Sequence, residues 1–162
     1  MQSPVPAFAH SLTALSKILD KAEAWADAKK IKPETLLNLR LIADMLPLWR
    51  QVTIACDHAK GASARLAQVD VPSFPDTEAS VAELKERIAK TIAFISSIPA
   101  EAYDGAETRT VTIKVGGNDR SFPAMQYFAS YAQPNFFFHM TTAYAILRSN
   151  GLDVGKGDFI GG

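Results

Sequence analysis

Four long stretches of this chain repeat their apolar residues every three or four positions, which is the spacing of one face of an α-helix. They cover about residues 8–28, 33–67, 77–98 and 123–150. The links between them are short, except for the one that precedes the fourth stretch. Helices of this length joined by short links predict an all-α protein, a four-helix bundle.

Prolines interrupt this pattern at defined places. Pro47 removes a backbone donor inside the second stretch, so we expect a kink or break near Met45. Pro72 and Pro75 predict a loop before the third helix, and Pro134 interrupts the fourth. After Pro47, small and apolar residues form a stripe that allows close helix packing: Leu48, Val52, Ala55, Ala59, Ala62 and Leu66.

The segment from Thr110 to Phe122 changes to the two-residue period of a β-strand. Val111, Ile113 and Val115 alternate with polar residues, and Gly116–Asp119 has the composition of a turn. The sequence therefore predicts a small β-hairpin between helices 3 and 4. Because a lone hairpin is marginal in water, we expect it to lie against the helices.

Composition excludes several classes of protein. The 162 residues fit one domain over residues 1–162, since no repeat or long linker is present. Lys plus Arg is 17 and Asp plus Glu is 17, a balance that argues against a nucleic-acid partner. One cysteine excludes an internal disulfide and a cysteine-rich zinc site. We expect a cytoplasmic protein without a membrane partner, because neither a signal peptide nor a membrane-spanning apolar run is evident.

A row of polar residues follows the fourth predicted helix. Asn135 and His139 are four residues apart and Thr142 follows three later, so the three share one face. Tyr131 lies one turn earlier on the same face. On the second helix, His58 lies at the edge of the small-residue stripe. Because sites in bundles are built from facing helices, His58 and His139 could meet across the core.

Two interpretations of this histidine pair remain open. Two neutral imidazoles with an oxygen ligand and open positions suit a divalent metal. A histidine on a partly apolar face is, however, more often a hydrogen-bonded core or cleft residue. His10 lies near the start of the chain, apart from the pair.

Other ionisable residues have structural explanations. Cys56 and His58 are two positions apart, which is about 200° around a helix, so a thiolate–imidazole pair is geometrically poor. We expect Cys56 to be a small buried residue. Glu83, Glu86 and Arg87 indicate charge pairing on the surface of the third helix.

Two runs of residues resemble a known family. Residues Asp44–Gln51, which lead to Ala55–Ala59, and residues Pro134–Arg148 resemble helices of the DinB-like (YfiT-type) bundles, within them a branch of unassigned function. The resemblance covers nearly the whole chain. It implies a four-helix bundle, often a homodimer, with a divalent metal held by three histidines. One comes from helix two, and two come from a His-x-x-x-His pattern on helix four. Characterised members resemble thiol-dependent transferases and isomerases.

The resemblance carries over to individual positions with one departure. His58 matches the ligand from helix two, and His139 matches the second histidine of the helix-four pair. Asn135 stands where the first histidine of that pair falls, and an amide oxygen is a weaker ligand than imidazole for zinc or nickel. The resemblance thus implies a degenerate metal site of His58, His139 and Asn135. Tyr131 and Thr142, on the same helix face, are candidates to line the pocket and orient a substrate.

Three hypotheses on function follow. The first is an uncharacterised DinB-like protein whose divalent metal, zinc or nickel, supports thiol-dependent transferase or hydrolase-like chemistry. The second is a metal-free binder of a small molecule, in which His58, Asn135 and His139 form the polar floor of an aromatic pocket. The third is a structural homodimer whose polar residues only satisfy one another.

Overall fold

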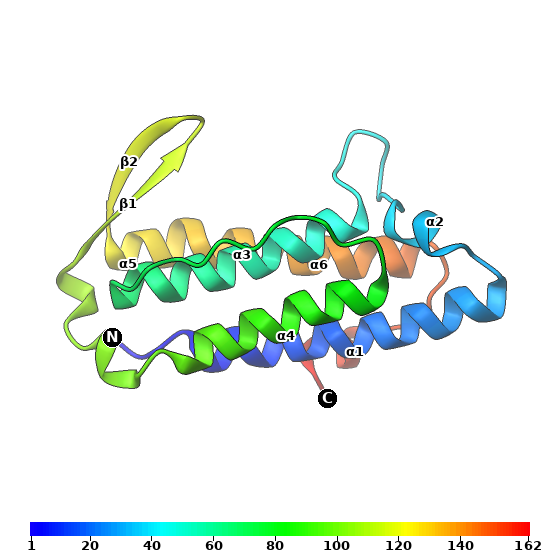
Figure 1. Ribbon diagram of the computed structural model, residues 1–162, viewed down its shortest axis with the longest axis horizontal. Helices are drawn as coiled ribbons and strands as arrows, with labels where there is room; N and C mark the ends of the chain where they lie inside the picture. Colours follow the sequence, from blue (N-terminus) through cyan, green and yellow to red (C-terminus); the bar gives the residue numbers. More distant parts are fainter.

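Four long helices form the body of the computed structural model, which describes residues 1–162 (Figure 1). They are α1 (Val5–Lys29), α3 (Leu48–Ala67), α4 (Val81–Ser97) and α6 (Gln133–Ser149). Helix α3 packs against α4 and α6, and α1 packs against α4. The predicted all-α four-helix bundle is confirmed.

The second predicted helix is divided, as Pro47 indicated. Only Pro33–Leu37 forms the short helix α2, and residues 38–47 leave the helical path before α3 begins. Pro47 is extended, with φ −71° and ψ 166°, and it precedes the first residue of α3. The N–H of Leu48 donates to the carbonyl of Leu39 at 2.9 Å, which closes this connection.

The small-residue stripe of α3 lies at the centre of the core. All six of its side chains are fully buried: Leu48, Val52, Ala55, Ala59, Ala62 and Leu66. They pack towards α6, on which Phe136, Met140 and Ala143 are also buried. The segment between α3 and α4 runs along the outside of α3 (Figure 1). Helix α3 is therefore covered on most of its sides.

Helix α4 begins at Val81, four residues later than the sequence predicted. The hydroxyl of Ser80 accepts from the N–H of Glu83 at 3.2 Å, and the Glu83 carboxylate accepts from the backbone N–H that precedes the cap. This is a variant of the capping box. Upstream, the Glu78 side chain binds Arg87, so the chain approaches α4 in an extended conformation.

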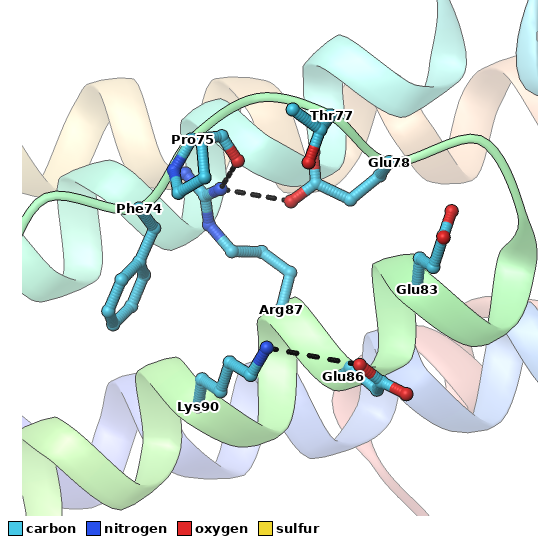
Figure 2. Close-up of a pocket in the computed structure, with 8 residues that line it drawn as sticks. All are labelled: Phe74, Pro75, Thr77, Glu78, Glu83, Glu86, Arg87 and Lys90. Atoms are coloured by element: carbon cyan, nitrogen blue, oxygen red, sulfur yellow. Dashed lines mark hydrogen bonds and ion pairs between the residues drawn. The ribbon is translucent and has the colours of Figure 1, made fainter.

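Arg87 is a buried cation that holds this extended segment on the bundle (Figure 2). Its guanidinium donates to Asp57 on α3 at 3.0 Å, to Glu78 at 2.9 Å and to the Pro75 carbonyl at 3.0 Å. Asp76 lies 3.3 Å away. Arg87 is only 3% exposed, so the prediction of surface charge pairing there is wrong. Its acidic partners come from α3 and the loop, which local spacing cannot reveal.

A pocket of ≈ 200 Å³ lies between this loop and α4, and Figure 2 shows the residues that line it. The Phe74 ring lies 5.3 Å from the Arg87 guanidinium and 4.3 Å from Lys60 Nζ. Outside the network, Lys90 and Glu86 form an exposed ion pair at 3.9 Å. The Phe74 ring beside Lys60 thus attaches the loop to α3, and the ion pairs of Arg87 with Asp76 and Glu78 attach it to α4.

The Arg87→Gln variant should lower the free energy of unfolding by about 3 kcal/mol, because it leaves the buried Glu78 carboxylate without its cation. The side chain of Glu78 is only 8% exposed, so its charge cannot be solvated by water when the arginine is removed. Lys90→Gln removes an exposed pair from the same helix and should cost less than about 1 kcal/mol. Urea unfolding measures both, and equal losses would contradict the structural role of Arg87.

The predicted hairpin is confirmed. Strand β1 (Thr110–Val115) pairs with β2 (Asn118–Pro123) in an antiparallel register. Gly116 and Gly117 both have positive φ, 59° and 85°, as a two-residue primed turn requires. Val111 is buried at the base, while the tip extends beyond the helices (Figure 1). Two short 3₁₀ turns precede it, Ala100–Tyr103 (η1) and Ala106–Thr108 (η2).

The fourth predicted helix is continuous but not uniform. It starts as α5 (Ala124–Tyr127), passes through a π-helical turn η3 (Phe128–Ala132) and continues as α6. Pro134 has no N–H to donate, which disturbs the regular α pattern just before it. The N–H of Gln133 donates to the Phe128 carbonyl, five residues back. Such π turns occur often at functional sites, and Tyr131 lies in this one.

A short last helix, α7 (Lys156–Ile160), is absent from the sequence prediction because five residues are too few to show a period. It packs against α1. Lys21 binds Asp158 at 2.6 Å, and His10 Nε2 lies 2.7 Å from the Ile160 carbonyl. His10 therefore belongs to the contact between α1 and α7 and not to the histidine pair.

Some apolar side chains remain on the surface. Phe138 on α6 is 55% exposed, and Leu41 and Leu46 lie exposed in the segment before α3. None of the helices is both long enough and apolar enough to pass through a bilayer. The homodimer and the cytoplasmic location stay predictions.

Candidate functional site

The structure brings His58 and His139 together between α3 and α6. Their ring centroids are 5.9 Å apart and their planes differ by 14°, so the rings stack. The Tyr131 ring, from the π turn, meets His58 edge-on at 6.0 Å. These three side chains form the nucleus of the candidate site.

Gln51 holds His139 in one orientation. Its Nε2 donates to the Leu46 carbonyl at 2.9 Å, so its Oε1 faces His139 Nδ1 at 2.7 Å and accepts a hydrogen bond. On this assignment Nδ1 carries the proton and Nε2 keeps a lone pair. Gln51 is 1% exposed. Sequence reasoning missed Gln51. The one available signal was the break at Pro47, which leaves the Leu46 carbonyl free to accept from the Gln51 side chain.

Asn135 and Thr142 are engaged with their own helix. Asn135 Nδ2 donates to the Tyr131 carbonyl at 2.6 Å, and Thr142 Oγ1 donates to the Phe138 carbonyl at 2.7 Å. Thr142 lines a separate surface groove together with Phe138. Asn135 lies one turn before His139 on α6, and its side-chain oxygen makes no hydrogen bond within the protein.

A pocket of ≈ 440 Å³ opens beside His58. It lies between α3, the segment formed by α5 and η3, and strand β1 of the hairpin. The Tyr127 hydroxyl accepts from Arg65 Nη1 at 3.3 Å, and the Tyr127 and Tyr131 rings stack at 6.0 Å. Sequence reasoning missed Arg65, although it lies two helical turns after His58 on the same face. The lining comprises Asp57, His58, Arg65, Thr112, Ile113, Lys114, Tyr127 and Tyr131.

Burial keeps the two histidines and the Tyr127 hydroxyl neutral at pH 7. Burial, and to a smaller extent the neighbouring His139, lower the pKa of His58 to about 4. Burial and Arg50 lower the pKa of His139. Burial raises the pKa of the Tyr127 hydroxyl. On the opposite side of α3, Cys56 is buried as predicted, and burial raises the pKa of its thiol to about 12.

The residues around His58 do not complete the three-histidine set that the family resemblance implies. Nowhere in the chain do three His, Cys, Asp or Glu side chains gather in a group that could hold a metal ion. Asp57 is next in sequence, but its carboxylate is bound by Lys60 and Arg87, each at 3.0 Å. The available donors are two imidazoles and the amide oxygen of Asn135.

Known proteins share this architecture. The chain matches the family described as "Domain of unknown function (DUF1993)" over residues 1–160. It belongs to that family. The crystal structure of a DinB family member from Shewanella denitrificans is 40% identical, with a TM-score of 0.89, and the match covers 98% of this chain and 89% of that one. The DinB-like assignment made from the sequence is thus confirmed. No curated protein matches the chain.

The lowered histidine pKa predicts how the DUF1993 protein responds to acid. Between about pH 6.5 and 4 the unfolded chain protonates His58 while the folded chain does not, so the unfolded state binds more protons. The free energy of unfolding should therefore fall as the pH drops through this window. Urea unfolding of EDTA-treated protein at several pH values measures the loss.

The His58→Gln variant serves as the control, because glutamine has no proton to gain in this range. It should reduce the dependence on pH above about 4 and leave the smaller part that His139 contributes. An unchanged slope in this variant would show that His58 does not cause the loss.

Proposed function

We propose that this DUF1993 protein binds a small molecule in the pocket beside His58. The observation that carries the proposal is the convergence of His58, Arg65, Tyr127 and Tyr131 on one opening of ≈ 440 Å³. Ligand sites usually enclose about 300–1,000 Å³ and combine aromatic walls with a few polar groups. The pocket has this size, and its lining combines two tyrosine rings and Ile113 with five polar or charged side chains.

The unequal hydrogen bonding of the three histidines supports binding over a purely structural role. His139 is satisfied by Gln51, and His10 by the Ile160 carbonyl. No hydrogen bond within the protein involves His58, although its ring lines the pocket. A neutral imidazole has one donor and one acceptor nitrogen, so His58 can offer both to a ligand. If the polar residues only satisfied one another, His58 would have a partner in the chain.

Each element around the pocket has a distinct part in this function. The stacked His139 supports the His58 ring from behind, and Gln51 holds His139 in place. The π turn places Tyr131 against the edge of His58, as an aromatic wall. Strand β1 of the hairpin lines one side of the opening with Thr112, Ile113 and Lys114.

A thermal-shift screen with a broad set of metabolites tests the proposal. A compound at 100 times its Kd should stabilise the folded chain by about 2.7 kcal/mol and raise Tm. The gain should disappear in His58→Ala and shrink in Tyr131→Phe. Tyr144→Phe is the matched control, because its hydroxyl binds the Val154 carbonyl elsewhere on α6. Stabilisation that persists in His58→Ala, or no stabilising compound at all, would contradict the proposal.

A divalent-metal site is the second candidate, and the orientation of His139 favours it. Gln51 occupies the Nδ1 proton and leaves Nε2 free, the arrangement in which outer partners hold metal-binding histidines. His58 and the side-chain oxygen of Asn135 would be the other donors for zinc or nickel. The thiol-dependent transferase or hydrolase-like activity that the family resemblance implies would need this metal.

Restoring a third imidazole tests the metal candidate. Asn135→His should tighten zinc or nickel binding by about tenfold or more, because imidazole is the stronger ligand. His58→Ala should abolish binding, and His10→Ala should not change it. Competition with a chromophoric chelator, on protein without a histidine tag, measures the affinities. Wild-type protein that binds neither ion would overturn this candidate and leave the ligand pocket untouched.

A further inference from the structure

Arg65 is a half-buried arginine of the pocket that lacks an acidic partner. Its one hydrogen bond within the protein goes to the Tyr127 hydroxyl, at 3.3 Å. By contrast, Arg87 binds three acidic side chains, Arg50 binds Asp76, and Arg148 binds Asp153. A guanidinium has five N–H donors, and most of those on Arg65 are unused by the protein.

A glycine lets the Arg65 side chain lie along α3. A Cβ atom at Gly61 would clash with Nη1 of Arg65 and stand 3.3 Å from its Cζ. A glycine inside a helix lowers the stability of the helix by about 1 kcal/mol relative to alanine. At position 61 it leaves the space that the Arg65 guanidinium occupies. Because His58 and Arg65 are two turns apart, one face of α3 presents an imidazole, bare backbone and a guanidinium in succession.

The pocket carries unbalanced positive charge. Its cations are Arg65 and Lys114, and Lys114 is an exposed residue of β1 that pairs with Asp119 at 3.0 Å. Its single acid, Asp57, already binds Lys60 and Arg87. The charge without a counterpart is therefore that of Arg65, whose planar fork matches the oxygens of a carboxylate or a phosphate.

We infer that the ligand of this pocket carries an oxyanion, a carboxylate or a phosphate group, that binds the Arg65 guanidinium. The rest of the ligand lies against His58 and Tyr131, where a neutral imidazole N–H adds a further donor. This inference rests on the proposed function and deepens it, since it assigns the chemical class of the ligand to the same pocket.

NMR titration of the full ¹⁵N-labelled chain tests the inference at constant ionic strength. The probes are sodium phosphate, sodium benzoate and benzamide, which has the shape of benzoate without its charge. We expect phosphate or benzoate to shift the Arg65 Nε–H signal saturably, while the Arg148 signal stays in place. The two anions distinguish a phosphate site from a carboxylate site, and benzamide should bind at least about tenfold more weakly than the better anion.

Two variants separate a positioned guanidinium from general charge. Arg65→Gln should weaken anion binding by about tenfold or more, whereas Arg148→Gln, which removes an exposed arginine at the far end of α6, should not. Gly61→Ala keeps the charge and improves helix propensity, but its methyl group displaces the guanidinium. Urea unfolding of Gly61→Ala checks that the variant is folded, so that a weaker anion affinity reports the displaced guanidinium.

Three outcomes would overturn the inference. The first is the absence of a saturable anion shift at Arg65. The second is equal anion affinity in Arg65→Gln and the wild type. The third is benzamide binding as tightly as benzoate, with shifts at His58 and Tyr131. This last result would support the pocket as a ligand site, so it distinguishes failure of the inference from failure of the proposed function.

Discussion

The contact between α3 and α6 organises this protein. Ala55, Ala59 and Ala62 leave no bulk between the two helices, so their axes can approach closely. The stacked rings of His58 and His139 lie along this contact, 5.9 Å apart. Larger side chains in the alanine stripe would separate the helices and the rings with them. The geometry of the site is thus a consequence of core packing.

The polar residues of α3 fall into two sets, one that is ion-paired within the protein and one that faces the pocket. Asp57 and Lys60 belong to a network that Arg87 completes, and that network holds the loop before α4 in place. His58 and Arg65 face the pocket, and the protein supplies no carboxylate or carbonyl to either. The first set stabilises the fold, because unpaired buried charge is costly. The second keeps its donors for a partner from solution, which is why we assign binding to that side.

Membership of the DUF1993 and DinB families agrees with the fold and limits what the fold implies. The architecture is shared, but the donor set is this chain's own, because Asn135 stands beside His139 where the resemblance expects a histidine. A two-imidazole pair held neutral by burial can serve a metal or an organic ligand. Function in such a bundle depends on the side chains between its helices, and proteins of one fold can differ in those side chains.

The sequence by itself determined the elements whose signals are local. Periodicity predicted the long helices, alternation with two glycines predicted the hairpin, and Pro47 predicted the break before α3. Helical spacing also marked His58, Asn135 and His139. Only the tertiary structure decided the partners, since those depend on residues distant in the chain. It buried Arg87 among acids from α3 and the loop, joined Gln51 to His139 and left Arg65 unpaired. Spacing along a helix reports which face a residue occupies, whereas the fold alone decides what that face meets.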